Sequence, residues 1–180
     1  MTPQPRAARP RRPPDAGRSA VYAGEDQVAR LLDRSVEFPV VEVAGSKIAL
    51  PPERHFGDLA GVQRYVDRVL ALGWVARRWP EAAVPVTVRE RRGVTRAHYE
   101  AGTHTIAVPV RGVETRWALR ELVLLHELAH HFTGSGTGAI DAGHGPAFTA
   151  LLLELAGGVM GEEVAFLLRV AWMDQGVVIG

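Results

Sequence analysis

The spacing of apolar residues along the chain predicts several helices. Apolar positions recur every three or four residues in five segments, which predicts helices at 24–34, 59–72, 116–132, 146–156 and 162–173. The third of these segments is almost wholly apolar, which is typical of a helix buried on most sides. Pro146 suits the first turn of the fourth helix, and the pair Gly157-Gly158 predicts its end.

Shorter runs with alternating or β-branched residues predict strands between these helices. They lie at 36–43, 47–50, 84–90, 94–100 and 103–110. Gly45-Ser46 predicts a turn between the first two strands, and Arg91-Arg92-Gly93 predicts a hairpin between the third and the fourth. Pro109 makes the fifth run an edge strand or marks its end. We therefore expect an α+β fold, with a small twisted, mainly antiparallel sheet packed on the helix at 116–132 and further helices toward the C-terminus.

The first 20 residues differ in composition from the rest of the chain. They hold five arginines against one aspartate and no large apolar residue beyond Met1, so they cannot bury enough surface to offset chain entropy. We expect residues 1–20 to form a disordered basic tail and residues 21–180 to form a single domain. The tail is either a solvated leader or an arm that binds nucleic acid. The leader is favoured, because no aromatic residue is interleaved with the arginines.

Composition narrows the classes of function. Apolar residues make up 47% of the chain, which is enough for a core, and no apolar run reaches the roughly 18 residues that a membrane span needs. The chain has no cysteine, which excludes a disulfide and any thiolate ligand to a metal. A cytoplasmic location fits this composition.

Residues 126–130 read His-Glu-Leu-Ala-His and match the HExxH pattern. Side chains at i and i+4 project from the same face of a helix, about 5–6 Å apart at Cβ. The imidazoles of His126 and His130 can therefore converge on one zinc ion at about 2.0–2.1 Å. Glu127 follows the first ligand and can act as catalytic base toward a water that the ion makes acidic. The apolar surroundings support this interpretation, because buried imidazoles and carboxylates need partners.

A third ligand is expected from the segment after this helix. The glycine-rich loop 133–143 can reverse the chain and bring His144 over the motif. Three imidazoles and one open position would then form a tetrahedral catalytic site with one zinc ion per chain. Glu154, from the following helix, is one alternative for the third ligand. Asp141 is another, although it also suits a role as acceptor for an imidazole N–H.

Further polar side chains precede the motif. Among His98, Tyr99 and His104, Tyr99 is the best candidate to donate a hydrogen bond to the oxyanion formed in hydrolysis. The alternative is that all three are ordinary strand side chains, with Tyr99 half-buried. His131 is expected to face away from the metal, because adjacent residues on a helix diverge by about 100°.

The motif together with His144-Gly145-x-x-Phe148 resembles the zincin metallopeptidases, and within them the SprT-like group. The chain is most similar to small actinobacterial HExxH metallohydrolases of unknown substrate, from about Val21 to the C-terminus. The resemblance includes the stretch 96–100 and the run 125–132. It implies a zincin-like α+β fold, zinc on the three histidines, Glu127 as base, and an edge strand that receives an extended peptide.

These features predict a zinc-dependent hydrolase, and more specifically a metallopeptidase that acts on a peptide or protein substrate. The alternative is a regulatory or binding protein that keeps a zincin scaffold without turnover. An open coordination position favours the enzyme over a purely structural zinc site.

Overall fold

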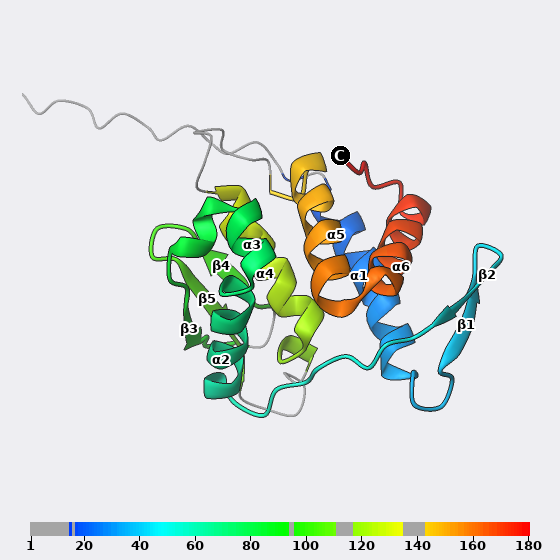
Figure 1. Cartoon of the computed structure of the whole chain (residues 1–180), viewed down its shortest axis with the longest axis horizontal. Helices are drawn as coiled ribbons and strands as arrows, with labels where there is room; N and C mark the ends of the chain where they lie inside the picture. Colours follow the sequence, from blue (N-terminus) through cyan, green and yellow to red (C-terminus); the bar gives the residue numbers. More distant parts are fainter. Residues whose placement is uncertain (1–14, 16, 94–95, 111–116, 135–142) are drawn as a thin grey trace, which may run out of the picture.

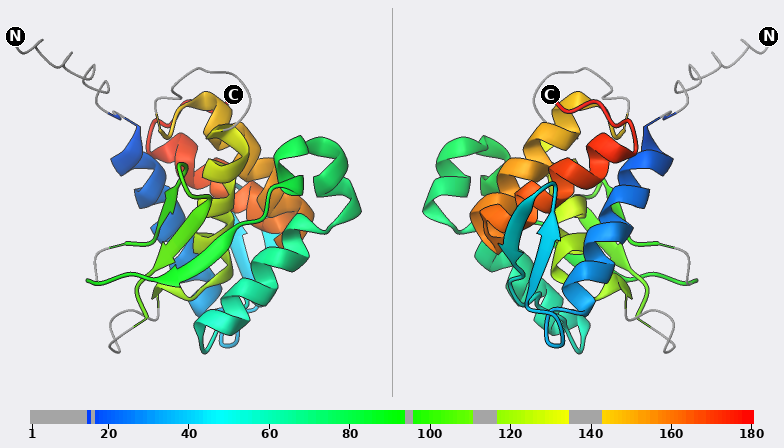
Figure 2. Two further views of the ribbon diagram at one scale, coloured as in Figure 1. Left: turned by 90° about the vertical axis from the view of Figure 1, so that its left-hand side faces the viewer. Right: turned by 90° about the vertical axis from the view of Figure 1, so that its right-hand side faces the viewer.

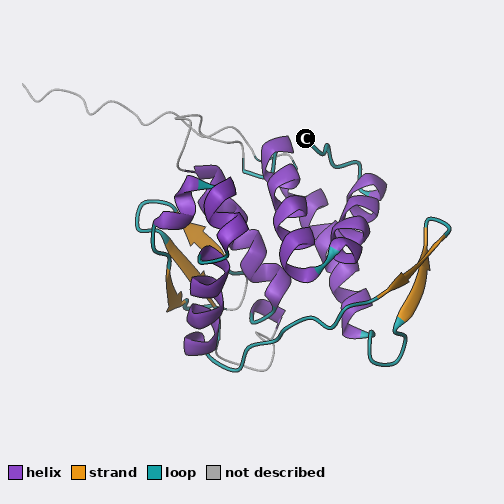
Figure 3. Cartoon of the chain, in the orientation of Figure 1, coloured by secondary structure: helices purple, strands orange, loops and turns teal. Residues whose placement is uncertain are grey.

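The computed structural model describes residues 15, 17–93, 96–110, 117–134 and 143–180. Within these ranges the fold is α+β, as expected, and most of it is helical (Figure 3). The helices are α1 (Arg18–Asp33), α2 (Leu59–Leu70), α3 (Gly73–Arg78), α4 (Glu121–Gly134), α5 (Pro146–Met160) and α6 (Glu162–Asp174), with a 3-10 turn η1 (Pro80–Ala83). The strands are β1 (Val40–Val43), β2 (Ser46–Ala49), β3 (Thr87–Glu90), β4 (His98–Glu100) and β5 (Thr105–Val108).

Helix α4 lies at the centre of the molecule, between a helical layer and the larger sheet (Figure 1). Helix α5 packs on one side of it, within a layer that also contains α6 and α1, and the sheet of β3, β4 and β5 lies on the other side, as the two views in Figure 2 also show. Leu124, Leu125 and Leu128 are fully buried, and so is Ala129. The almost wholly apolar sequence of this segment therefore has the buried environment that it predicted.

The three-stranded sheet corrects the strand pairing expected from the sequence. Its order is β3-β5-β4, with β5 parallel to β3 and antiparallel to β4, so the sheet is mixed and the predicted hairpin between the third and fourth strands is wrong. All four residues of β5 are buried, whereas β3 and β4 are partly exposed. The most apolar strand thus takes the central position, and Pro109 follows its end without interrupting the ladder.

The other two strands form a separate antiparallel hairpin at the opposite end of the molecule (Figures 1 and 3). Its turn consists of Ala44 and Gly45, with φ angles of 50° and 77°. Two consecutive positive φ angles match the twist of the flanking strands, which is typical of a two-residue hairpin.

Helix α5 continues through the two glycines that were expected to end it. It runs to Met160, and Gly161 then breaks the helix with a φ of 115°. Gly158 lies directly against the indole of Trp74, where a Cβ would be 2.5 Å from the nearest ring atom. The glycine is therefore required by close packing on α3 and does not terminate the helix.

Helix α1 begins at Arg18, within the segment assigned to the tail, and it is anchored by Trp172 of α6. The indole N–H of Trp172 donates to the carbonyl of Val21 at 3.0 Å. Both residues are fully buried. Residues 1–14 and 16 of the expected tail lie outside the described ranges.

The first turn of α4 is fixed by the segment that precedes α2. The carboxylate of Glu53 accepts a hydrogen bond from the backbone N–H of Leu122 at 3.0 Å, which is favourable at the positive end of a helix dipole. The buried guanidinium of Arg120 donates to the same carboxylate at 2.9 Å and also binds Asp33 and the carbonyl of Ala29. Arg120 thus joins the start of α4 to the end of α1.

No helix in the described part of the chain is both long and apolar enough to cross a membrane.

We predict that Gly24→Ala destabilises the protein, although alanine usually stabilises a helix relative to glycine. A Cβ at this position would lie 2.4 Å from Cδ1 of Trp172, so α1 and α6 must separate. The unfolding free energy should fall by about 1–3 kcal/mol in urea denaturation. Gly57→Ala is the matched control, because a Cβ there meets nothing within 4 Å, and equal stability of the two variants would contradict the prediction.

Candidate metal centre

Three imidazoles, two from helix α4 and one from the segment just before α5, meet at one point in the core. His126 and His130 lie one turn apart on α4, and His144 stands just before α5. One ligand nitrogen from each of the three rings lies within 4.8 Å of the other two, and His126 and His144 are buried. The structure therefore brings together the three residues that the sequence proposed as metal ligands.

Two carboxylates orient two of these rings. Nδ1 of His126 lies 2.8 Å from Oε1 of Glu25, and Nδ1 of His144 lies 2.6 Å from Oδ2 of Asp15. A carboxylate on the outer nitrogen fixes the tautomer of a metal-ligating histidine and raises its basicity. Both carboxylates come from the N-terminal part of the chain, since Glu25 belongs to α1 and Asp15 precedes it.

The inner nitrogens of these two rings point at each other. Nε2 of His126 and Nε2 of His144 are 3.1 Å apart. When each Nδ1–H donates to a carboxylate, both Nε2 atoms present lone pairs, and two lone pairs at this distance repel unless a proton or a cation lies between them. Two nitrogens bound tetrahedrally to zinc at about 2.0–2.1 Å are about 3.3–3.4 Å apart. The donor set and its spacing therefore fit a small divalent cation.

Glu127 lies beside this cluster and is 2% exposed. Burial, and then the negative charge of Glu25, raise the pKa of Glu127 to about 8, although a hydrogen bond from the backbone N–H of Tyr99 opposes this shift. Burial likewise raises the pKa of Glu25 to about 8. The two carboxyl groups are thus poised to change protonation near neutral pH.

Burial favours the neutral forms of His126 and His130. It lowers the pKa of His126 well below its ordinary value, with a further contribution from the charge of His144. Burial, followed by the charges of His126 and His144, lowers the pKa of His130 to about 2. A neutral imidazole has a free lone pair, which is the form that binds a metal.

Aromatic rings surround the three histidines. The buried ring of Phe148 stacks on His130 with 4.4 Å between the ring centroids and also contacts His126 and His144 at 4.9 and 4.8 Å. The ring of Tyr22 stacks on His126 at 4.9 Å, and the guanidinium of Arg96 lies 3.8 Å from the centroid of Tyr22. These contacts hold the imidazoles in place and limit access of water.

The alternative third ligands do not join the cluster within the described residues. Glu154 is exposed on α5, where it accepts a hydrogen bond from Nε of Arg78 at 2.7 Å, and it points away from the three histidines. Asp141 lies outside the described residues. His144 is thus the third ligand that the geometry favours.

The side chain of Tyr99 serves a different network. Its hydroxyl lies 2.8 Å from Nδ1 of His131 and 2.8 Å from Nδ1 of His104. Nε2 of His131 donates to the carbonyl of Glu81 at 2.9 Å, so its neutral ring accepts the Tyr99 proton at Nδ1. Tyr99 therefore ties β4 to α4 and η1 through His131. Its expected role as a hydrogen-bond donor to an oxyanion stays a prediction. His131 faces away from the metal ligands, as expected.

A second group of possible ligands is less suitable for a metal. Asp33, Glu53 and His55 also bring one donor atom each within 4.8 Å of the others. However, Asp33 and His55 are exposed, and the guanidinium of Arg120 already binds both carboxylates. A positive charge is therefore present at this position without a metal.

Sequence reasoning did not identify Asp15, Tyr22 or Glu25. Asp15 and Tyr22 belong to no recognisable sequence motif. The position of Glu25 could have indicated a role, because Glu25 lies three residues before Val28 and seven before Leu32, on the apolar face of α1. An acidic residue on the buried face of a helix indicates a partner of opposite charge or a hydrogen-bond donor.

No known protein family, no curated protein and no solved structure matches this chain.

We predict that Tyr99→Phe destabilises the protein without loss of bound metal. The variant leaves Nδ1 of the buried His131 without its donor, which costs about 1–3 kcal/mol. Urea denaturation measures this loss, and elemental analysis measures the metal content. Unchanged stability of Tyr99→Phe would contradict this structural role.

Proposed function

We propose that this protein is a zinc-dependent hydrolase that cleaves peptide or amide bonds. The proposal rests above all on the convergence of His126, His130 and His144, in which two outer nitrogens are bound by carboxylates and two inner nitrogens lie 3.1 Å apart. This arrangement has the parts expected of a catalytic zinc site: three imidazole ligands, carboxylates that orient two of them, and a glutamate beside them.

Zinc suits these ligands better than other common divalent ions. All three donors are imidazole nitrogens, which zinc binds in tetrahedral geometry, whereas magnesium and calcium prefer oxygen. Three protein ligands leave a fourth position for water or substrate, which distinguishes a catalytic from a structural site. A bound zinc ion supplies a Lewis acid that polarises a carbonyl and makes water acidic at neutral pH.

Glu127 is the group of this chain that moves a proton. It follows His126 on α4, and its carboxylate is held by the backbone N–H of Tyr99. A cation held by the three histidines would lower the pKa of Glu127 and favour its carboxylate form, which would accept a proton from the attacking water and deliver it to the leaving amine. Tyr22 and Phe148 cover the imidazoles, which lowers the local dielectric and strengthens each electrostatic interaction at the site.

The larger sheet supports a zincin-like arrangement and a peptide substrate. Strand β4 lies at an edge of this sheet, and its Tyr99 N–H binds the proposed base. An extended peptide can pair with an edge strand through main-chain hydrogen bonds. A peptide that pairs with β4 would bring its own carbonyl groups close to Glu127.

Purified protein should contain one zinc ion per chain. We expect His126→Ala and His144→Ala to lose this zinc, because each removes one of three ligands. Glu154→Ala and the exposed His55→Ala are matched controls that should retain it. Elemental analysis of the purified variants measures the zinc content. Zinc retained in His144→Ala, or no stoichiometric metal in the wild type after zinc is supplied, would contradict the proposed centre.

Glu127→Gln should keep zinc and lose hydrolysis of peptide pools by about 100-fold or more, because glutamine cannot accept the proton from water. Glu163→Gln, on the exposed side of α6, is the control and should be as active as the wild type. Mass spectrometry of a digested peptide pool measures cleavage. Full activity in Glu127→Gln would exclude the proposed mechanism, and a zinc-bound wild type that cleaves no peptide would favour a binding role.

A further inference from the structure

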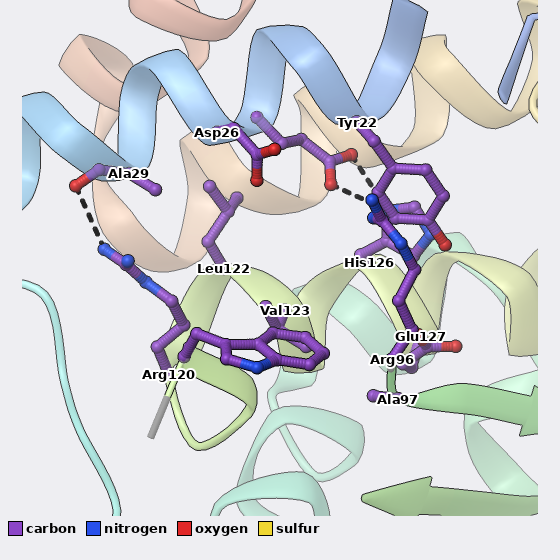
Figure 4. A pocket seen from close by; sticks show the side chains of 12 residues that line it. Tyr22, Asp26, Ala29, Arg96, Ala97, Arg120, Leu122, Val123, His126 and Glu127 are labelled. Carbon is purple, nitrogen blue, oxygen red and sulfur yellow. Dashed lines mark hydrogen bonds and ion pairs between the residues drawn. The ribbon is translucent and has the colours of Figure 1, made fainter. Parts of the chain in front are cut away.

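A cavity of about 170 Å³ opens directly beside the proposed catalytic residues. Its lining includes His126 and Glu127 at one end and extends along α1 and α4 toward Arg120. Figure 4 shows Tyr22 and Asp26 of α1 on one side, with Leu122 and Val123 of α4 on the other. A substrate whose carbonyl lies at Glu127 therefore has this cavity next to the bond that is attacked.

Part of the lining is apolar. It consists of the side chains of Ala29, Ala97, Trp117, Leu122 and Val123. Ala29, Trp117 and Val123 are only partly buried, although they belong to or adjoin helices at the centre of the fold. Apolar side chains left accessible in a concave surface are typical of a ligand-binding pocket.

The charged groups that border the cavity are mostly engaged by other protein groups. Arg120 binds Glu53, Asp33 and the carbonyl of Ala29, and Glu25 binds His126. Arg96 lies over the ring of Tyr22, and Asp26 is exposed to solvent. Arginines and carboxylates both border the cavity, so a charged side chain of either sign would meet a group of like charge there.

The volume of the cavity indicates the size of the side chain that it can bind. An apolar cavity of about 150 Å³ engineered into another protein stays dry and binds benzene. A cavity of about 170 Å³ therefore accepts a phenyl ring or a branched aliphatic side chain of similar volume. A smaller side chain would not fill the cavity and would lose van der Waals contacts with its walls.

We propose that the cavity is the specificity pocket, and that it binds an aromatic or long aliphatic side chain of the substrate residue adjacent to the cleaved bond. This inference rests on the proposed hydrolase function and adds a substrate class to it: peptides with an uncharged, bulky apolar residue at that position. Most of the walls of the pocket come from α1 and α4, the two helices that Glu25 and Arg120 join.

The first test measures binding without turnover, so that it is independent of zinc and hydrolysis. The full chain, as purified and after removal of metal by a chelator, is titrated with N-acetyl-phenylalanine amide and with N-acetyl-glycine amide, and binding is followed by NMR. We expect the phenylalanine compound to bind at least about tenfold more tightly in both forms. Equal affinity for the two compounds would overturn the proposal, even if the chain binds zinc and cleaves peptides.

Variants of the wall locate the binding site. Val123→Phe and Ala29→Leu fill the cavity from α4 and from α1, and each should weaken binding of the phenylalanine compound at least about tenfold. Val159→Phe, at a partly buried position on α5 away from the cavity, is the matched control and should bind as the wild type does. Thermal unfolding checks that each variant folds. Wild-type affinity in both folded wall variants would overturn the proposal.

Hydrolysis gives a second readout. In the zinc-loaded chain, peptides with phenylalanine or leucine beside the cleaved bond should have kcat/KM at least about tenfold above peptides with glycine there. Val123→Phe should remove this preference, so that kcat/KM for the phenylalanine and leucine peptides falls at least about tenfold relative to that for the glycine peptides. Equal kcat/KM for all of these peptides would overturn the proposed specificity pocket. Selective binding without any cleavage would support the pocket and contradict the proposed hydrolase function.

Discussion

A helix that is buried on almost every side cannot leave an imidazole or a carboxylate without a partner, and α4 carries three histidines and two glutamates. The structure supplies polar partners for several of these side chains, each from a different direction. Glu25 binds His126 from α1, and the backbone of β4 binds Glu127. Tyr99 and η1 bind His131. The arrangement of elements around α4 follows from this requirement, because an unpaired buried polar group costs on the order of 1–3 kcal/mol.

Helix α1 is the element on which the centre depends most. It is fixed to α6 by the indole of Trp172 and to the start of α4 by Arg120. Between these two anchors it presents Tyr22 and Glu25 to His126, and it forms one wall of the adjoining cavity. Orientation of a ligand and shape of a pocket are thus set by one helix, so a change in its packing alters both.

The N-terminal segment contributes directly to the candidate site. Asp15 lies two residues before the cap of α1, and its carboxylate binds both the ring and the backbone N–H of His144. His144 is the one proposed ligand that does not belong to a helix. The hydrogen bonds to Asp15 therefore contribute most to holding its ring in position. The hydrogen bonds and charge of His144 lower the pKa of Asp15 despite the opposing effect of burial. The segment therefore has a structural role at the centre as well as a basic composition.

Local patterns predicted five of the six helices in the described residues, the α+β class and the convergence of His126 and His130, because apolar periodicity and the i, i+4 spacing are local properties. His144 was also proposed as a ligand, although its meeting with the other two depends on the fold. The sequence did not predict the short helix α3. It did not determine the strand order. The pairing of β5 with β3 depends on which strand is buried, and burial is decided by the whole fold. Nor did it assign Tyr99, Gly158 or Glu25, whose roles come from His131, Trp74 and His126. These partners lie far away in sequence, and only the tertiary structure brings them into contact.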